Sequence, residues 1–246
     1  MIIGTQKGGT TSLHSYLLKH PGFGPTLTKE IHYFDRAHLP SMRWYQAHFP
    51  MRLPRERICI DSTPQYLTHP LVPQRVKEFY PFMKFVVLLR NPVERAYSHY
   101  NHRVSRNQEH RRFEDAIDEL IKSEGTYAST SEKFEDSGRP EGPNKDFRNY
   151  LNRGKYAIQI RNWFDSFSRD QFLILNSEEF FSNPREAIAE VCQFVGVGGD
   201  FQGATRVENS GGNYPRMSPE IRETLTSYYE SSNDDLYSLL NVDYRW

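Results

Sequence analysis

Short apolar runs alternate along the chain with stretches in which apolar residues recur every three or four positions. Four apolar runs predict β-strands at residues 1–5, 57–61, 84–90 and 171–176, and a weaker run covers 23–25. Strands that alternate with helices are typical of a parallel sheet covered by helices on both faces. The pattern therefore predicts an α/β fold with a central, mostly parallel sheet of about five strands.

Helical spacing connects these strands. Thr10–His20 places Leu13, Tyr16 and Leu17 on one face, and the helix is expected to stop before Pro21. Asn91 followed by Pro92 supplies a capping residue and a first helical residue for a helix that runs to about Arg106. Further helices are predicted over residues 156–167, 184–195 and 219–240.

Residues 123–149 interrupt this regularity, because they are polar, rich in Ser, Glu, Gly and Pro, and show no period. A loop of this length in a compact domain is usually a lid, a binding loop or a disordered segment. We interpret it as a possible lid over an acceptor site. With no repeat and no linker between two cores, the sequence predicts a single domain over residues 1–246.

The net charge of the chain limits which kinds of partner molecule it is expected to bind. The 31 Lys and Arg residues balance 31 Asp and Glu residues, whereas proteins that bind nucleic acid or anionic membranes usually carry a basic excess. The longest purely apolar run, Phe85–Leu89, is too short to span a bilayer, and the first residues lack the pattern of a secretory signal. We therefore expect no nucleic-acid partner, no integral membrane segment and a cytoplasmic location.

Candidate chemistry begins where the first strand ends. A glycine-rich loop and a helix follow that strand, and this arrangement presents backbone N–H groups and a positive helix end to a phosphate. A plain turn between strand and helix is the alternative, but a lysine, two glycines and three hydroxyls occur together here. The predicted phosphate contacts are Lys7, Gly8, Gly9, Thr10, Thr11 and Ser12.

This loop differs from a nucleoside-triphosphate loop at one position. Gly4 and Gly9 have the spacing of G-x-x-x-x-G-K-[ST], and Thr11 stands at the hydroxyl position. Thr10, however, occupies the place of the lysine that holds β- and γ-phosphates, and the lysine has moved to Lys7. The loop therefore disfavours a small-molecule kinase and suits a nucleotide with a single 5′-phosphate that carries the reactive group.

Several ordered motifs then resemble one family. The loop from Ile3 to Ser12 resembles the 5′-phosphosulfate loop of sulfotransferases that use 3′-phosphoadenylyl sulfate (PAPS), closest to the heparan sulfate 3-O- and N-sulfotransferase-like group. Other blocks resemble the group's motifs in the same order: Lys29–Asp35, Asp61–Tyr66, Leu89–Tyr100, Gly154–Ala157 and Arg216–Ile221. The resemblance implies a P-loop NTPase-like three-layer fold. It also implies in-line transfer of a sulfuryl group from PAPS to a hydroxyl or amine, with release of adenosine 3′,5′-bisphosphate (PAP).

The reaction needs a base and positive charge near the leaving phosphate, but no metal. From the residues alone, Glu30 and His32 are both candidate bases, and alternation in an extended segment points them to one side with Lys29 opposite. A surface Lys-Glu pair before buried aromatics is the alternative reading. The resemblance assigns the base to Glu30, a supporting role to His32, and charge stabilisation at the bridging oxygen to Lys7. A non-catalytic nucleotide-binding module is disfavoured because Glu30 and Lys7 are both present.

A second phosphate contact is expected at Arg90, which ends an apolar strand, with Ser98 two turns into the next helix. The alternative is that Arg90 pairs with Glu94. The resemblance implies that Arg90 and Ser98 bind the 3′-phosphate. It adds candidate nucleotide contacts at Gly212, Asn213, Tyr214 and Arg216.

The acceptor site is predicted from the remaining polar residues of these motifs, namely Lys29, His32, Asp61, Ser62 and His99. Ser62 stands where the heparan-modifying group has a lysine that helps to hold an anionic sugar. Together with the zero net charge, this indicates a less charged carbohydrate or a small hydroxylated metabolite rather than heparan sulfate itself.

Overall fold

The computed structural model describes residues 1–51, 57–127, 150–198 and 214–246. Their contacts divide the chain into two compact units, Met1–Arg90 with Ile158–Ser210 and Asn91–Ala157 with Gly211–Trp246. In the parts of the chain covered by the structure, the helices are all too short or too polar to cross a membrane.

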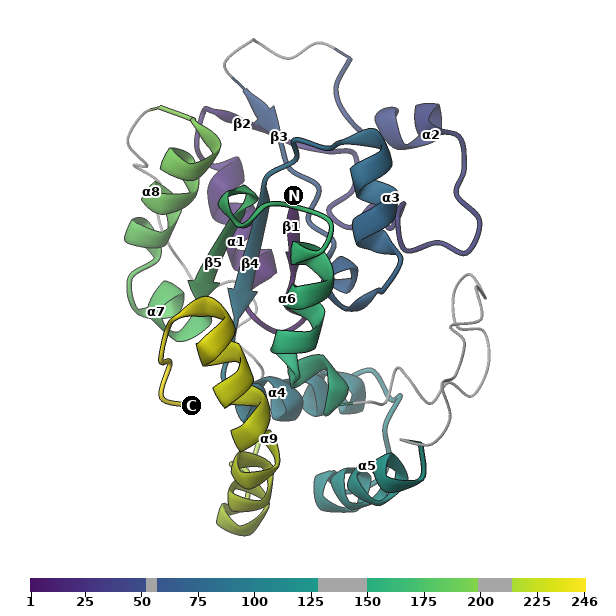
Figure 1. Ribbon diagram of the computed structural model, residues 1–246, viewed down its shortest axis with the longest axis vertical. Helices are drawn as coiled ribbons and strands as arrows, with labels where there is room; N and C mark the ends of the chain where they lie inside the picture. Colours follow the sequence, from purple (N-terminus) through teal and green to yellow (C-terminus); the bar gives the residue numbers. More distant parts are fainter. Residues whose placement is uncertain (52–56, 128–149, 199–213) are drawn as a thin grey trace. The chain divides into compact units, whose positions relative to one another are not determined.

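The first unit contains a parallel sheet in the order β1-β4-β5 (Figure 1). Its strands are β1 (Ile2–Gly4), β4 (Phe85–Leu89) and β5 (Phe172–Asn176). A separate parallel pair joins β2 (Phe23–Gly24) to β3 (Ile58–Cys59). All five predicted strand positions are therefore confirmed, but among the described residues the central sheet has three strands instead of about five.

The reason for the smaller sheet lies directly after β3. The chain makes one parallel bridge, between Ile2 and Ser62, and then enters the 3-10 helix η1 (Pro64–Thr68). Proline has no N–H to donate to a ladder and fixes its own φ, so pairing with β1 ends there. The β2–β3 pair is consequently joined to the central sheet by one bridge instead of a full ladder.

Helices cover both faces of the central sheet, as predicted. Val86 and Leu88 of β4 belong to a core cluster with residues of α1 (Thr10–Leu18) and α8 (Pro184–Val195). Side chains alternate along a strand, and Phe85 packs instead on Trp163 of α6 (Tyr156–Phe164), with ring centroids 4.9 Å apart. The predicted three-layer α/β arrangement is confirmed.

Besides η1, three helices and one 3-10 helix in the described part of this unit were not predicted. They are short or follow a buried strand directly, so they carry little periodic signal. They comprise α2 (Met42–Gln46), α3 (Val72–Phe79), η3 (Arg169–Gln171) and α7 (Ser177–Ser182).

The second unit is helical, with α4 (Pro92–Val104), α5 (Phe113–Tyr127), η2 (Asn152–Gly154) and α9 (Pro219–Leu240), and it includes the first turn of α6. The Asn91 side chain accepts hydrogen bonds from the N–H groups of Val93 and Glu94, at 2.9 and 3.3 Å, which confirms the predicted cap.

One boundary in this unit was wrong. The polar segment was expected to begin at Ser123, but α5 continues to Tyr127 because its apolar face is buried: Phe113, Ala116 and Ile117 belong to the core of the unit. Residues 128–149 of that segment lie outside the described residues.

Candidate active site

The loop between β1 and α1 has the backbone of an anion site. Lys7 and Gly9 both adopt left-handed conformations, with φ of 72° and 99°. Gly9 is the N-cap of α1 and makes no side-chain capping bond. Because the first N–H groups of a helix have no acceptor within the helix and carry its positive end, this loop is suited to hold a phosphate.

Two protein donors hold the carbonyl groups of this loop. The Ser177 hydroxyl donates to the carbonyl oxygen of Gly8 at 2.7 Å, and the Arg90 guanidinium donates to that of Lys7 at 3.0 Å. Arg90 directly follows β4 and Ser177 directly follows β5, so neighbouring strand ends fix the loop. Ser177 was missed in the sequence, although its place after a buried strand was an available signal.

Glycine is required in the loop by close packing. A Cβ atom on Gly8 would lie 2.7 Å from the carbonyl oxygen of Leu88, and one on Gly9 would lie 2.8 Å from the ring of Phe181. Thr5 Oγ1 and Gln6 Oε1 are buried and have no hydrogen-bond partner among the described residues. The Thr5 hydroxyl can donate to a phosphate oxygen and so fits the predicted nucleotide phosphate, whereas the Gln6 oxygen can only accept and does not support it.

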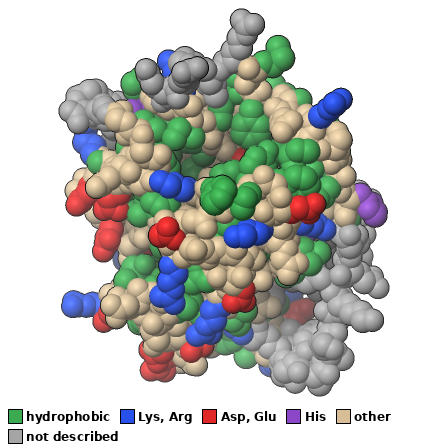
Figure 2. All heavy atoms as spheres, turned by 45° about the horizontal axis from the view of Figure 1, so that its top comes forward, with side chains coloured by type: hydrophobic (Ala, Val, Ile, Leu, Met, Phe, Trp, Pro, Cys, Tyr) green, Lys and Arg blue, Asp and Glu red, His purple; other side chains and the backbone are tan. Residues whose placement is uncertain are grey.

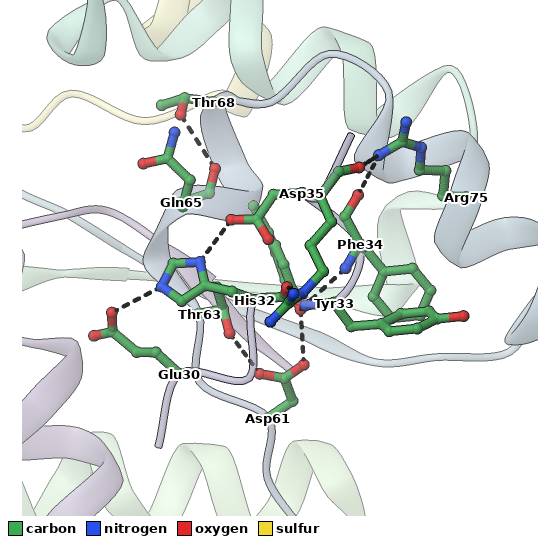
Figure 3. A network of polar contacts seen from close by, with 12 residues as sticks. Glu30, His32, Tyr33, Phe34, Asp35, Asp61, Thr63, Gln65, Thr68 and Arg75 are labelled. Carbon is green, nitrogen blue, oxygen red and sulfur yellow. Dashed lines mark hydrogen bonds and ion pairs between the residues drawn. The ribbon is translucent and has the colours of Figure 1, made fainter. Parts of the chain in front are cut away.

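The candidate base lies in a chain of charged contacts (Figure 3). Glu30 accepts from the Lys29 ammonium at 2.7 Å, and its second oxygen lies 3.4 Å from Nε2 of His32. The other ring nitrogen of His32 lies 2.7 Å from Asp35 Oδ2. Asp35 was not singled out in the sequence, but its place three residues after His32 was visible.

The alternation expected of residues 29–34 is not observed. The segment forms no strand, and His32 has a left-handed backbone with φ of 51°. The Lys29 ammonium also lies 2.7 Å from Glu30 instead of pointing to the opposite side.

These contacts set the charge state of the network. Burial opposes ionisation of Glu30, but hydrogen bonds from His32 and Lys29 outweigh it and lower the pKa of Glu30 to about 2. Hydrogen bonds to Asp35 and then to Glu30 raise the pKa of His32 to about 9. At neutral pH the site therefore holds an ionised Glu30, able to accept a proton, beside a protonated imidazole.

The base network lies beside β1 and α1, which flank the phosphate loop. The N–H of Ser62 donates to the carbonyl oxygen of Lys29 at 3.3 Å, and Ser62 makes the bridge to Ile2 of β1. On α1, burial lowers the pKa of His14 to about 4, the charge of Lys29 lowers it further and the charge of Glu30 opposes the shift. Glu30 therefore interacts electrostatically with an imidazole of α1, an interaction that the sequence did not indicate.

Asp61 and Ser62, two predicted acceptor residues, are buried. Asp61 accepts hydrogen bonds from the hydroxyls of Thr63 at 2.7 Å, Tyr45 at 3.1 Å and Tyr66 at 3.2 Å. The Ser62 hydroxyl is fully buried and has no hydrogen-bond partner among the described residues. Both therefore contact protein in this structure, whereas Lys29 and His32 are partly exposed.

A cavity of about 270 Å³ lies near the start of β1, while the phosphate loop follows the other end of that strand. Its lining is mainly aromatic and apolar, and comprises Met1, Tyr45, Gln46, Phe49, Cys59, Asp61, Tyr80 and Met83. On the face shown in Figure 2, hydrophobic side chains gather in the upper half, and basic and acidic side chains are interspersed below them. The described side chains drawn on that face form no extended basic surface.

The remaining predicted residues belong to the second unit. Ser98 and His99 lie on α4 and are buried, and His99 packs edge-on against Tyr150. Burial, followed by the charges of nearby arginines, lowers the pKa of His99 well below its usual value.

The segment with Tyr214 and Arg216 is held against the same helix. The Tyr97 hydroxyl donates to the carbonyl oxygen of Pro215 at 2.7 Å, and the rings of Tyr97 and Tyr214 meet edge to face. Gly212 and Asn213 lie outside the described residues. A search of the described part of the chain finds no group of three or more His, Cys, Asp or Glu side chains arranged to hold a metal ion.

A phosphate loop after the first strand of a parallel sheet, with an ionised carboxylate near the following helix, defines a group-transfer site on a P-loop-like fold. The sulfotransferase domain family matches residues 1–210, and the chain belongs to this family. The predicted resemblance is thereby confirmed, and the family places the chain among the transferases.

Known relatives agree with this assignment. A membrane-associated sulfotransferase, kil1 of Dictyostelium discoideum, is 26% identical over the whole chain. Heparan sulfate glucosamine 3-O-sulfotransferase 6 of Mus musculus is 26% identical over the whole chain, and the match covers 72% of that relative's length. A bifunctional heparan sulfate N-deacetylase/N-sulfotransferase of the same species is 27% identical over 98% of the chain.

The chain spans only part of the length of these relatives: 66% of the Dictyostelium discoideum protein and 30% of the bifunctional enzyme. Among solved structures, a sulfotransferase from Alicyclobacillus acidocaldarius superposes with a TM-score of 0.79 at 26% identity. The match covers 98% of this chain and 95% of that chain.

Proposed function

We propose that this chain transfers the sulfuryl group of PAPS to a hydroxyl or amine of an acceptor, with Glu30 as the base. The observation that carries the proposal is the position of Glu30. Its carboxylate is ionised and lies in the segment tied to β1 through Ser62, near His14 of the helix that begins at the phosphate loop.

The proposed step is an in-line displacement at sulfur. A lone pair of the acceptor oxygen or nitrogen forms the new bond to sulfur, while the bond from sulfur to the bridging oxygen of the 5′-phosphate breaks and its electrons stay with PAP. The acceptor proton passes to Glu30. His32, held by Asp35 at 2.7 Å, keeps the carboxylate oriented. Lys7 and the N–H groups at the start of α1 stabilise the charge that develops on the departing phosphate.

The rest of the donor site is proposed from the motifs. Gly8, Gly9, Thr10, Thr11 and Ser12 hold the 5′-phosphate in this proposal. The proposed contacts of the 3′-phosphate and of the remaining nucleotide are Arg90, Ser98, Gly212, Asn213, Tyr214 and Arg216.

For the acceptor we propose a carbohydrate or a small hydroxylated metabolite, contacted by Lys29 and His32, which are partly exposed. Asp61, Ser62 and His99 were also expected to contact the acceptor, but they are buried in this structure and are not proposed as direct contacts. The names of two relatives point to a glycan acceptor. The zero net charge and Ser62 in place of a lysine favour a less charged acceptor than heparan sulfate. Labelled sulfate transfer from PAPS across a panel of glycans and hydroxylated metabolites tests this choice.

Two further expectations stay proposals. We propose that residues 1–246 act as one sulfotransferase domain and that the protein works in the cytoplasm. Limited proteolysis tests the single domain, because cleavage anywhere within one domain is expected to abolish PAP binding. Cell fractionation tests the cytoplasmic location.

The base is tested by Glu30→Gln, which removes the proton acceptor and keeps the shape of the side chain. Sulfuryl transfer is expected to fall at least ~100-fold, a loss typical for a general base, while calorimetric PAP binding stays within about twofold of the unmodified protein. The matched control is Glu190→Gln, at an exposed position of α8, which should leave both quantities unchanged. Full turnover in Glu30→Gln would remove Glu30 from this role.

The kinase alternative is tested by the same calorimetric titration, with ATP and Mg²⁺ compared with PAP. Because Thr10 replaces the lysine that binds β- and γ-phosphates, PAP is expected to bind more tightly than ATP with Mg²⁺. Tighter binding of ATP would contradict the choice of PAPS as donor.

A further inference from the structure

The hydroxyl of Tyr66 joins the buried core of the first unit to the segment that carries Glu30 and His32. Tyr66 is fully buried in η1. Its oxygen accepts hydrogen bonds from the N–H groups of Tyr33 at 3.0 Å and Phe34 at 3.4 Å, and its O–H donates to Asp61 at 3.2 Å.

Asp61 orients this hydroxyl. Its carboxylate is 2% exposed and also accepts from Thr63 and Tyr45, so its oxygens are fixed by three hydroxyl donors. Burial raises the pKa of Asp61, and hydrogen bonds from the Thr63, Tyr45 and Tyr66 hydroxyls oppose this shift. The O–H of Tyr66 donates to Oδ2 of Asp61 and therefore points toward it. The lone pairs of the Tyr66 oxygen are thereby left to face the backbone of residues 33 and 34.

The peptide group between His32 and Tyr33 is held at both ends. Its N–H donates to Tyr66 at 3.0 Å, and its carbonyl oxygen accepts from Nε of Arg36 at 2.6 Å. Arg36 in turn stacks over the ring of Trp44, 4.6 Å from its centroid. Fixing both ends of one peptide plane fixes ψ of His32, which helps to set the direction in which the imidazole leaves the backbone.

Such a restraint is needed here because the backbone of His32 is strained. A φ of 51° in a non-glycine residue is unfavourable, and contacts with the surrounding structure must hold the residue in this conformation. In this conformation the ring reaches Glu30 with one nitrogen and Asp35 with the other. Without the two peptide contacts, the segment is free to relax and the ring loses these partners.

We propose that Tyr66, oriented by Asp61, is a positioning residue that holds the His32–Tyr33 peptide and so keeps the imidazole of His32 between Glu30 and Asp35. The proposal rests on the proposed function in one respect only, the role of Glu30 as base. The geometry of the network is testable without any acceptor.

Tyr66→Phe and Tyr45→Phe form a matched pair. Each substitution removes a hydroxyl that donates to Asp61, at 3.2 Å from Tyr66 and at 3.1 Å from Tyr45. Only the Tyr66 hydroxyl also accepts a hydrogen bond from the N–H of Tyr33. The readout is an NMR titration of ¹³C-labelled histidine in the whole chain, with the His32 resonance assigned through His32→Asn.

Tyr66→Phe is expected to lower the pKa of His32 by about one unit, because the ring loses part of its contact with Asp35 and Glu30. Tyr45→Phe should leave that pKa at its original value. An unshifted His32 in Tyr66→Phe, or an equal shift in both variants, would overturn the proposal.

Arg36→Gln serves as a second test if Tyr66→Phe fails to fold. Arg36 is exposed, and the variant releases the other end of the same peptide, so it should lower the pKa of His32 in the same direction. No shift in this variant would also overturn the proposal. Failure of the proposed function gives a different result, namely no PAP binding or full turnover in Glu30→Gln, with the His32 titration unaffected.

Discussion

The bond between Ser177 and the phosphate loop gives a sharp test of how the donor site is held. Ser177 is fully buried, and its hydroxyl donates to the carbonyl oxygen of Gly8 at 2.7 Å. Ser177→Ala removes the donor and leaves the carbonyl in place, with no side-chain oxygen to replace the bond.

The magnitude follows from burial. A buried acceptor that loses its donor costs about 1–3 kcal/mol, and 1 kcal/mol shifts the melting temperature of a chain of this size by about 2–4 °C. We therefore expect the free energy of unfolding to fall by about 1–3 kcal/mol and Tm by about 2–12 °C. The loop also becomes less ordered, so the affinity for PAP should fall, and bound PAP should restore part of the lost stability.

The assay is urea unfolding followed by circular dichroism, combined with calorimetric titration of PAP. Ser182→Ala is the matched control, because Ser182 lies in the same helix, α7, but is exposed and bonds only to the carbonyl oxygen of Glu178. That variant should change the free energy of unfolding by less than about 0.5 kcal/mol. Equal stability and equal PAP affinity in the two variants would refute the reasoning.

Two predictions concern other parts of the site. Asp35→Asn should bring the pKa of His32 from about 9 toward its ordinary 6.5 in an NMR titration. Because the folded pKa is raised, the stabilisation by Asp35 is present below pH 6.5 and is lost as pH rises through about 9, so the variant should be more destabilised at pH 6 than at pH 10. Gly8→Ala places a Cβ 2.7 Å from the carbonyl oxygen of Leu88 and should cost about 1–3 kcal/mol in urea unfolding. Gly198→Ala, whose added atom meets nothing within 4 Å, is the control, and equal stability of the two glycine variants would contradict the packing argument.

Local signals in the sequence predicted the helices that begin at a capping residue followed by proline. The helix that begins at Pro92 starts where Asn91 caps it, and α9 runs from Pro219 to Leu240 with Ser218 accepting a hydrogen bond from the N–H of Ile221. By contrast, α5 was missed because its polar exposed face resembles a loop, and its helical conformation is stabilised by burial of the opposite face.

Sequence alone also determined the phosphate loop, the motif with Glu30 and His32, and the family, because each depends on residue types at fixed spacing within a short segment. Only the tertiary structure decided which groups hold these segments. Ser177, at the start of α7, bonds to the loop residue Gly8, 169 positions away in the sequence, and Tyr66 bonds to the backbone of Tyr33 across 33 residues. Contacts of this kind arise when strands and loops pack side by side, so no local pattern encodes them. The left-handed backbone of His32 likewise has no local signal in the sequence, because it is a strained conformation that the surrounding packing stabilises.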